Sequence, residues 1–200
     1  MDYAAMANDV REFFASENID RAHLLGHSMG GKVAMQFALD NASSIDGLVV
    51  VDIAPKAYPP THKPLLAALK ALELANCKTY SDADRALAGN IPETQVRQFL
   101  ITNLARGTDA LLYWRIGLEE IIANYDALTE TVSADSNVAT RTCFIRAGRS
   151  NFIADDDIPE IRERFPNALV VTLIDASHWV HIDAADEFFR IVSGFLLAGG

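Results

Sequence analysis

The chain has 200 residues, half of them hydrophobic, and a formal net charge of −10 at pH 7. This length and composition suit one domain, or one domain with an insertion, around a sizeable buried core. Seventeen basic residues stand against 27 acidic ones without a Lys/Arg cluster, which argues against nucleic acid or an anionic membrane as a partner.

The sequence also indicates where in the cell the protein is located. No apolar run is long enough to span a membrane, and the N-terminus lacks the basic and apolar regions of a signal peptide. Cys77 and Cys143 lie far apart in the chain and are expected to be buried thiols in a reducing compartment rather than a disulfide. We therefore expect a soluble cytoplasmic protein.

The first predicted elements are a helix, a strand and a second helix. Apolar residues at helical spacing predict a helix over about residues 3–17. A short apolar stretch at residues 22–25 predicts a buried strand, and residues 31–39 return to helical spacing. Between that strand and the second helix lies the pentapeptide Gly26-His27-Ser28-Met29-Gly30.

A G-x-S-x-G match between a strand and a helix is typical of a nucleophile elbow, in which the serine hydroxyl projects above the sheet. Ser28 is the predicted nucleophile, and the backbone N–H of Met29 is the predicted oxyanion donor. We expect glycine to be required at Gly26 and Gly30 because a Cβ at either position would clash. A chance Gly/Ser turn is the alternative, which the flanking elements disfavour. The pattern therefore predicts a serine hydrolase.

The remaining chain alternates between strands and helices around a helical block. A continuous apolar run at residues 48–51 is typical of a strand covered on both faces of a parallel sheet. Strands are again predicted at 142–145 and 169–174, with helices at 158–165 and 184–197. Such alternation predicts right-handed crossovers and a parallel sheet. The fold class is α/β, with an α/β core over residues 1–60 and 135–200.

Residues 61–134 have a different character. Nearly all of this segment is predicted to be helical, with Pro64 and Pro92 opening two helices and a third running from Trp114 to Tyr125. An all-helical block set between strands is interpreted as a helical cap inserted over a site.

A serine hydroxyl needs a base to take its proton. Of the five histidines, His178 follows the last strand, at the carboxyl edge where the elbow also opens. His27 is adjacent to Ser28 in sequence, so its side chain is expected to point elsewhere. His178 and His181 could be metal ligands, but no third ligand converges on them. We predict His178 as the base and no metal.

The acid that orients the base is less clear from the residues alone. In the commonest arrangement of a Ser/His/acid triad on a parallel sheet, the acid follows the penultimate strand, where this chain has Asn151. The acidic run 155–157 is better explained as a helix N-terminus, and Asp175 is too near His178 in sequence. Asp52 remains, at the carboxyl end of the strand next to the elbow strand. A strand-end aspartate that stabilises its own turn is the alternative for this residue.

Several segments together resemble the YbfF-type esterase branch of the α/β-hydrolase superfamily. They are residues 26–32, 51–55, 98–104, 114–115 and 178–181. The resemblance runs from Met1 to about Leu197 and implies an α/β-hydrolase core with a cap. It also implies hydrolysis of carboxylic esters, with thioesters as an extension, and no cofactor. In that branch the acid follows the strand after the elbow, which carries over to Asp52.

The chain departs from this branch in one respect. Relatives have four strands before the point where this sequence begins, and one of them leads to the loop that supplies the second oxyanion donor. The C-terminal part of the core is thus what the sequence predicts, with the elbow strand at a sheet edge. An exposed edge of this kind invites a homodimer.

Two classes of function follow. The first is a serine esterase with the triad Ser28, Asp52 and His178, acting on a small-molecule ester or thioester. Its candidate substrate-binding residues are Phe99, Tyr113, Trp114 and Trp179, for which ordinary packing is the alternative. The second is a non-catalytic or truncated hydrolase-like protein that binds a ligand or partner without turnover.

Overall fold

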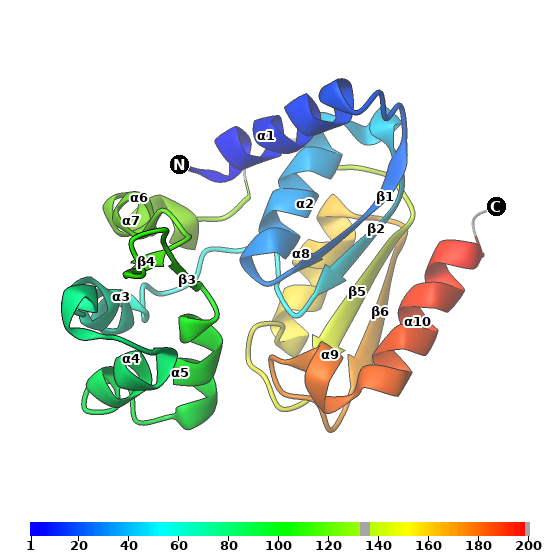
Figure 1. Cartoon of the computed structure of the whole chain (residues 1–200). Helices are drawn as coiled ribbons and strands as arrows, with labels where there is room; N and C mark the ends of the chain where they lie inside the picture. Colours follow the sequence, from blue (N-terminus) through cyan, green and yellow to red (C-terminus); the bar gives the residue numbers. More distant parts are fainter. Residues whose placement is uncertain (133–136, 199–200) are drawn as a thin grey trace. The chain divides into compact units, whose positions relative to one another are not determined.

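Four parallel strands form the central sheet in the computed structural model of the protein, which describes residues 1–132 and 137–198 (Figure 1). The strand order is β1-β2-β5-β6, and all three pairings are parallel. These strands are β1 (Ala22–His27), β2 (Ile45–Val51), β5 (Thr142–Ala147) and β6 (Ala168–Leu173). The predicted α/β class with a parallel sheet is confirmed, and β1, the strand before Ser28, lies at one edge.

Helices cover both faces of this sheet (Figure 1). One face packs against α1 (Tyr3–Ser16), α2 (Met29–Asp40) and α8 (Ile158–Arg164), and the other against α9 (Val180–Asp183) and α10 (Ala185–Leu197). Within β2, Leu48 and Val50 belong to the first apolar cluster and Val49 and Val51 to the second. Successive strand residues point to opposite faces, so a strand covered on both sides is apolar throughout.

The predicted helices at 3–17, 158–165 and 184–197 are confirmed to within one residue at each end. Two short 3₁₀ helices, η1 (Ala42–Ser44) and η3 (Asp155–Asp157), complete this part of the chain. In α1 the side chain of Asp2 caps the helix, because its carboxylate accepts a hydrogen bond from the N–H of Ala5 at 2.8 Å.

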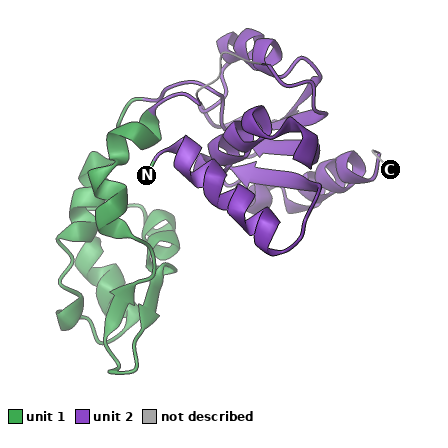
Figure 2. Ribbon diagram, turned by 90° about the horizontal axis from the view of Figure 1, so that it is seen from above, with its two compact units in different colours: residues 1, 59–129 green, residues 2–58, 130–200 purple. Residues whose placement is uncertain are grey.

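The chain divides into two compact units (Figure 2). One comprises residues 2–58 and 130–200 and contains the parallel sheet. The other comprises Met1 and residues 59–129. The predicted boundary at residues 60–61 falls two residues from the observed one, and the predicted boundary at 134–135 lies outside the described residues.

The second unit contains both helices and strands. Its elements are α3 (Lys63–Lys70), η2 (Leu74–Asn76), α4 (Tyr80–Leu87), α5 (Thr94–Ile101), β3 (Leu104–Arg106), β4 (Leu112–Trp114), α6 (Leu118–Ala123) and α7 (Tyr125–Thr129). The prediction that this segment is all helical was therefore wrong. Trp114 ends an antiparallel strand paired with Leu104, and the helix begins only at Leu118.

Burial explains this hairpin. Leu104 and Leu112 are each 4% exposed and contact Cys77 and Ala83 in a small apolar cluster. The turn between the strands includes Ala110 at a φ of 64°, a left-handed conformation that ends helical spacing. Strands of three residues have only a weak local preference for extended structure. The hairpin therefore forms because the two leucines are buried together.

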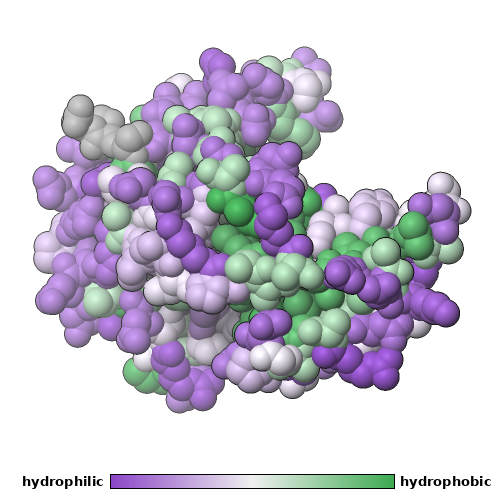
Figure 3. Space-filling model, turned by 90° about the vertical axis from the view of Figure 1, so that its left-hand side faces the viewer, coloured by the Kyte–Doolittle hydropathy of each residue, from purple (hydrophilic) through white to green (hydrophobic). Residues whose placement is uncertain are grey.

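Hydrophilic residues cover most of the face drawn in Figure 3, with apolar residues gathered in a smaller area near its centre. Cys77 and Cys143 are both free and buried. Among the described residues, no helix has the length and apolar character needed to cross a membrane.

Candidate active site

The turn between β1 and α2 is sharp and strained at one residue. Ser28 has a φ of 54° and a ψ of −123°, a conformation that is costly for a residue with a side chain. Backbone hydrogen bonds hold it there. The Ser28 N–H donates to the carbonyl of Val51 at 3.0 Å, and the Ser28 carbonyl accepts from the N–H of Gly31 at 2.8 Å. Met29 then begins α2, whose first N–H groups have no partners within the helix.

Gly26 allows β1 and α2 to approach each other closely, and Gly31 allows α2 to approach the segment that follows β2. A Cβ on Gly26 would lie 2.2 Å from the carbonyl oxygen of Gly30, and a Cβ on Gly31 would lie 2.6 Å from a side-chain carbon of Ile53. Gly26 is therefore required, as expected. The expectation for Gly30 was wrong, because a Cβ there would meet nothing within 4 Å.

Asp52 directly follows β2 and is fully buried. Its φ of 47° turns the chain at the end of the strand. One carboxylate oxygen, Oδ1, accepts a hydrogen bond from the N–H of Ala147 at 3.0 Å, and the backbone N–H of Asp52 donates to the carbonyl of Ile145 at 2.8 Å. These contacts fix the carboxylate between the ends of β2 and β5 and leave Oδ2 for another partner.

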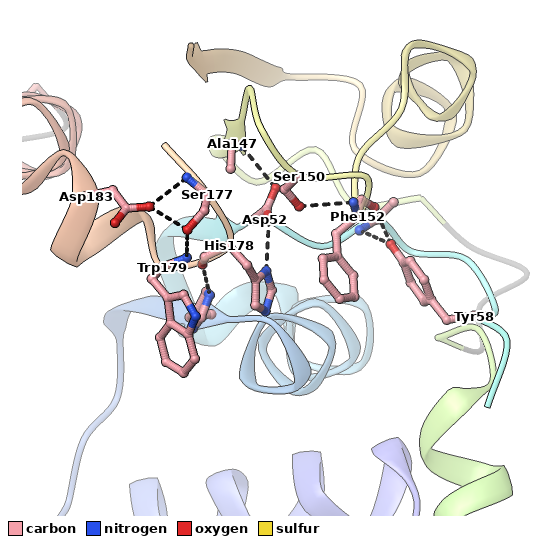
Figure 4. Close-up of polar contacts among 11 residues, drawn as sticks. Asp52, Tyr58, Ala147, Ser150, Phe152, Ser177, His178, Trp179 and Asp183 are labelled. Atoms are coloured by element: carbon pink, nitrogen blue, oxygen red, sulfur yellow. Dashed lines mark hydrogen bonds and ion pairs between the residues drawn. The ribbon is translucent and has the colours of Figure 1, made fainter. Parts of the chain in front are cut away.

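That partner is His178, in the loop after β6. Its Nδ1 lies 2.9 Å from Oδ2 of Asp52 (Figure 4). A carboxylate accepts hydrogen bonds, so this contact favours the imidazole tautomer with its proton on Nδ1. The His178 side chain is 24% exposed whereas that of Asp52 is 0% exposed. The pair thus has one fully buried member, Asp52, and one partly exposed member, His178.

His27 lies against His178, although it was expected to point elsewhere. The Nε2 atom of His27 is 2.8 Å from the backbone carbonyl oxygen of His178, and the two rings are 4.6 Å apart between centroids. Because a carbonyl only accepts, Nε2 of His27 donates. Burial, together with the neighbouring His178, lowers the pKa of His27 below 6.5, so the ring is neutral at pH 7. Sequence adjacency to Ser28 gave no sign of this contact.

The loop that carries His178 is also braced at its base. Asp183 Oδ2 accepts hydrogen bonds from the N–H of Ser177 at 2.8 Å and from its hydroxyl (Figure 4). These two bonds from Ser177 lower the pKa of the Asp183 carboxyl. The Ser177 hydroxyl also accepts from the N–H of Trp179 at 3.3 Å. The loop geometry is therefore set by residues on both sides of His178.

The other acids that were considered lie elsewhere. Asp157 forms an ion pair with Lys56 at 2.6 Å and accepts from the N–H of Ala154 at 2.7 Å. Asp155 pairs with Arg146, and the acidic run 155–157 forms η3 ahead of α8, as expected for a helix start. Asp175 and Asn151 are exposed. Within the described part of the chain, no group of three or more His, Cys, Asp or Glu residues could hold a metal ion.

The candidate substrate-binding residues fall in both units. Trp179 is half-buried beside His178, and its ring lies 6.4 Å from that imidazole. Phe99 on α5 and Tyr113 on β4 are 48% and 50% exposed. Trp114 is half-buried and packs against the apolar cores of the 59–129 unit.

Residues 1–191 match the Alpha/beta hydrolase family. The chain belongs to that family. It is 33% identical over 200 residues to sn-1-specific diacylglycerol lipase ABHD11 of Mus musculus, and the match covers 97% of this chain but 65% of the mouse protein. It is 30% identical to Esterase YbfF of Escherichia coli, with 98% and 75% covered.

A solved structure agrees in three dimensions. The structure described as a marine microorganism esterase superposes on this alpha/beta hydrolase with a TM-score of 0.94 and 35% sequence identity. The superposition covers 98% of this chain and 78% of that one. Homology to esterases and lipases of the ABHD11 and YbfF type thus extends over nearly the whole chain, which confirms the predicted family. The chain spans about two thirds of the curated vertebrate relatives.

Proposed function

We propose that this chain hydrolyses carboxylic esters through an acyl-enzyme on Ser28, with His178 as the general base and Asp52 as the residue that orients it. The observation that supports this most is the 2.9 Å contact between His178 Nδ1 and the buried Oδ2 of Asp52. With Nδ1 engaged, Nε2 is the nitrogen left to serve a nucleophile. Homology to esterases and lipases supports the choice of ester as the substrate.

In the proposed cycle His178 takes the proton of Ser28 as its oxygen attacks the acyl carbon. The imidazolium that forms is stabilised by Asp52, whose carboxylate stays ionised. The alcohol leaves with the proton from His178, and the acyl group remains on Ser28. Water then attacks the acyl carbon while His178 takes one of its protons. The bond between the acyl carbon and the Ser28 oxygen breaks, the acid is released, and His178 returns the proton to Ser28. A thioester would follow the same steps with a thiol as the leaving group.

The negative charge that develops on the carbonyl oxygen needs hydrogen-bond donors. We assign the N–H of Met29 to this role, because it stands at the start of α2 directly after the nucleophile and carries the positive end of the helix dipole. Removal of one such donor typically slows the reaction by about 10²- to 10³-fold.

Substrate selection is assigned to aromatic residues of both units. We propose that residues 59–129 act as a cap, with Phe99, Tyr113 and Trp114 contributing apolar surface to bind the acyl chain, and Trp179 contributing beside His178. Alanine at any of these positions should raise KM for a long-chain ester more than for an acetyl ester. Equal effects on both esters would remove that residue from the set.

We also propose that two copies pair through the exposed edge of β1, because an unpaired strand edge offers free backbone hydrogen-bonding groups. A sedimentation experiment decides this point, since a monomer at all concentrations would contradict it.

Covalent labelling tests the central assignment. A fluorophosphonate reacts only with an activated serine, so it should label Ser28 of the wild-type chain, with the adduct located by peptide mass spectrometry. His178→Ala should abolish labelling while Ser28 is still present. A folded protein that is not labelled would instead indicate a hydrolase-like protein that binds a ligand without turnover.

A further inference from the structure

An aromatic ring packs against the proposed base. The ring of Phe152 is stacked on the imidazole of His178, with 4.2 Å between centroids and 30° between the ring planes (Figure 4). Phe152 belongs to the loop after β5, where the commonest arrangement has the triad acid and this chain has Asn151, which is exposed to solvent. That loop therefore contacts His178 through an apolar ring rather than a carboxylate.

Phe152 is held in turn by Tyr58. The hydroxyl of Tyr58 donates a hydrogen bond to the carbonyl of Phe152 and accepts one from the N–H of Ala54 at 2.8 Å. The two rings are also in contact, with 5.6 Å between centroids. Ala54 lies two residues after Asp52. One hydroxyl thus ties the loop that carries Asp52 to the loop that carries Phe152.

Cations fix the Tyr58 ring. The ammonium of Lys32 lies 4.8 Å from the ring centroid and that of Lys56 lies 5.3 Å from it, distances at which a cation is attracted to an aromatic face. Lys56 is anchored by its ion pair with Asp157 at 2.6 Å. Burial raises the pKa of the Tyr58 hydroxyl well above 10, so it keeps the proton that it donates to Phe152.

We propose that Phe152 is a positioning residue for His178 and that Tyr58 holds Phe152 in place. The inference rests on the proposed role of His178 as the base. A ring stacked on the imidazole hinders its rotation away from Asp52, and the electron-rich ring face favours the imidazolium that forms during the reaction. The ionisable groups around His178 are Asp52 on Nδ1, His27 at 4.6 Å between rings, and His181 beyond His27.

The test uses Phe152→Leu, which keeps an apolar side chain but removes the aromatic face, and Phe152→Tyr, which keeps the ring. Phe152→Leu should lower kcat by about 10- to 100-fold with little change in KM, because misplacement of the base weakens the transition state rather than substrate binding. Phe152→Tyr should keep most of the wild-type kcat. Phe13→Leu, at a side chain 55% exposed on α1, is the matched control and should keep wild-type rates.

Tyr58→Phe removes only the hydroxyl and should give a smaller loss of kcat. Its control is Tyr125→Phe in the 59–129 unit, which likewise removes a hydroxyl that accepts a backbone hydrogen bond, from His62 at 2.9 Å. Urea unfolding of each variant separates a loss of stability from a loss of positioning. If Phe152→Leu does not fold, Phe152→Met replaces it in the comparison with Phe152→Tyr.

A second readout does not depend on turnover. The proton on Nδ1 of His178, in its hydrogen bond to Asp52, should give a sharp downfield NMR resonance in the wild-type chain at low pH. Phe152→Leu should broaden or abolish that resonance and Phe152→Tyr should retain it. A sharp, unshifted resonance and wild-type kcat in Phe152→Leu would overturn the inference. If the wild-type chain hydrolyses no ester, the proposed function fails, yet the resonance still decides whether Phe152 positions the imidazole.

Discussion

Ser28 and Asp52 occupy equivalent places on neighbouring strands. His27 and Val51, which directly precede them, are paired in the parallel register of β1 and β2. Both residues have positive φ, 54° for Ser28 and 47° for Asp52. The two chains therefore turn sharply at the same level of the sheet, and the serine and the carboxylate emerge at one carboxyl edge. This edge is where open α/β sheets hold their sites.

The first prediction concerns the acid. Asp52→Asn should lower kcat by about 10⁴-fold, because an amide cannot stabilise the imidazolium and favours the wrong tautomer of His178. Asp155→Asn is the matched control, since Asp155 is 87% exposed and forms a surface ion pair with Arg146. It should cost less than about twofold. Steady-state kinetics on both variants checks the ranking, and the reverse order would assign the acid to the loop after β5.

The second prediction concerns Gly26 and Gly30, the two glycines of the pentapeptide between β1 and α2. Gly26→Ala should destabilise the protein by about 3 kcal/mol or prevent folding, because its Cβ would lie 2.2 Å from the carbonyl oxygen of Gly30. Gly30→Ala should be neutral or should stabilise by up to about 1 kcal/mol, since alanine is the better helix former. Urea unfolding measures both. Equal stability of the two variants would mean that β1 and α2 are not as close as described.

The third prediction is a pH dependence caused by Lys32. This lysine is 1% exposed, and burial lowers its pKa to about 8 from 10.5. Between these two values the unfolded chain holds a proton that the folded chain has lost, so the free energy of unfolding should rise with pH there, by up to about 3 kcal/mol. Lys32→Met should remove this rise. Urea unfolding of both proteins at several pH values across that range measures the effect. If the free energy of unfolding changed equally with pH in the two proteins, the effect would be ruled out.

The fourth prediction is a second pH dependence of the same sign, at lower pH, caused by His27. Its pKa in the folded chain lies below 6.5 because the ring is buried beside His178. As the pH falls below 6.5, the unfolded chain takes up a proton that the folded chain resists, so this contribution to stability is lost toward acid pH. His27→Gln keeps a donor for the His178 carbonyl but cannot titrate, and should flatten the decline below about pH 6.5. Urea unfolding at several pH values measures this decline. The same decline in His27→Gln as in the wild-type chain would contradict the role of His27.

Much of the fold could be predicted because its signals are local. The apolar run of β2 and the helical spacing of α1 and α10 follow from burial on two faces or on one. The tight turn at Ser28 between β1 and α2 could be predicted as well, since a G-x-S-x-G sequence between a strand and a helix is typical of such a turn. The position of His178 after the last strand followed from the topology of parallel sheets.

The remainder depends on contacts between distant parts of the chain. The β3–β4 hairpin forms because Leu104 and Leu112 are buried together, which helical spacing in a single segment does not reveal. The stacking of Phe152 on His178 joins two loops, and the hydroxyl of Tyr58 joins a third. Gly30 and Gly31 are neighbours in one motif, yet only the second faces a side chain of Ile53.

The role of Ser28 as the nucleophile is tested by hydrolysis of a short-chain nitrophenyl ester by the wild-type chain, with Ser28→Ala alongside. The wild-type protein should turn over the ester, and the variant should be slower by about 10⁴-fold or more. Equal rates for the two folded proteins, or no turnover by the wild-type chain, would contradict the assignment of Ser28 as the nucleophile of a working esterase.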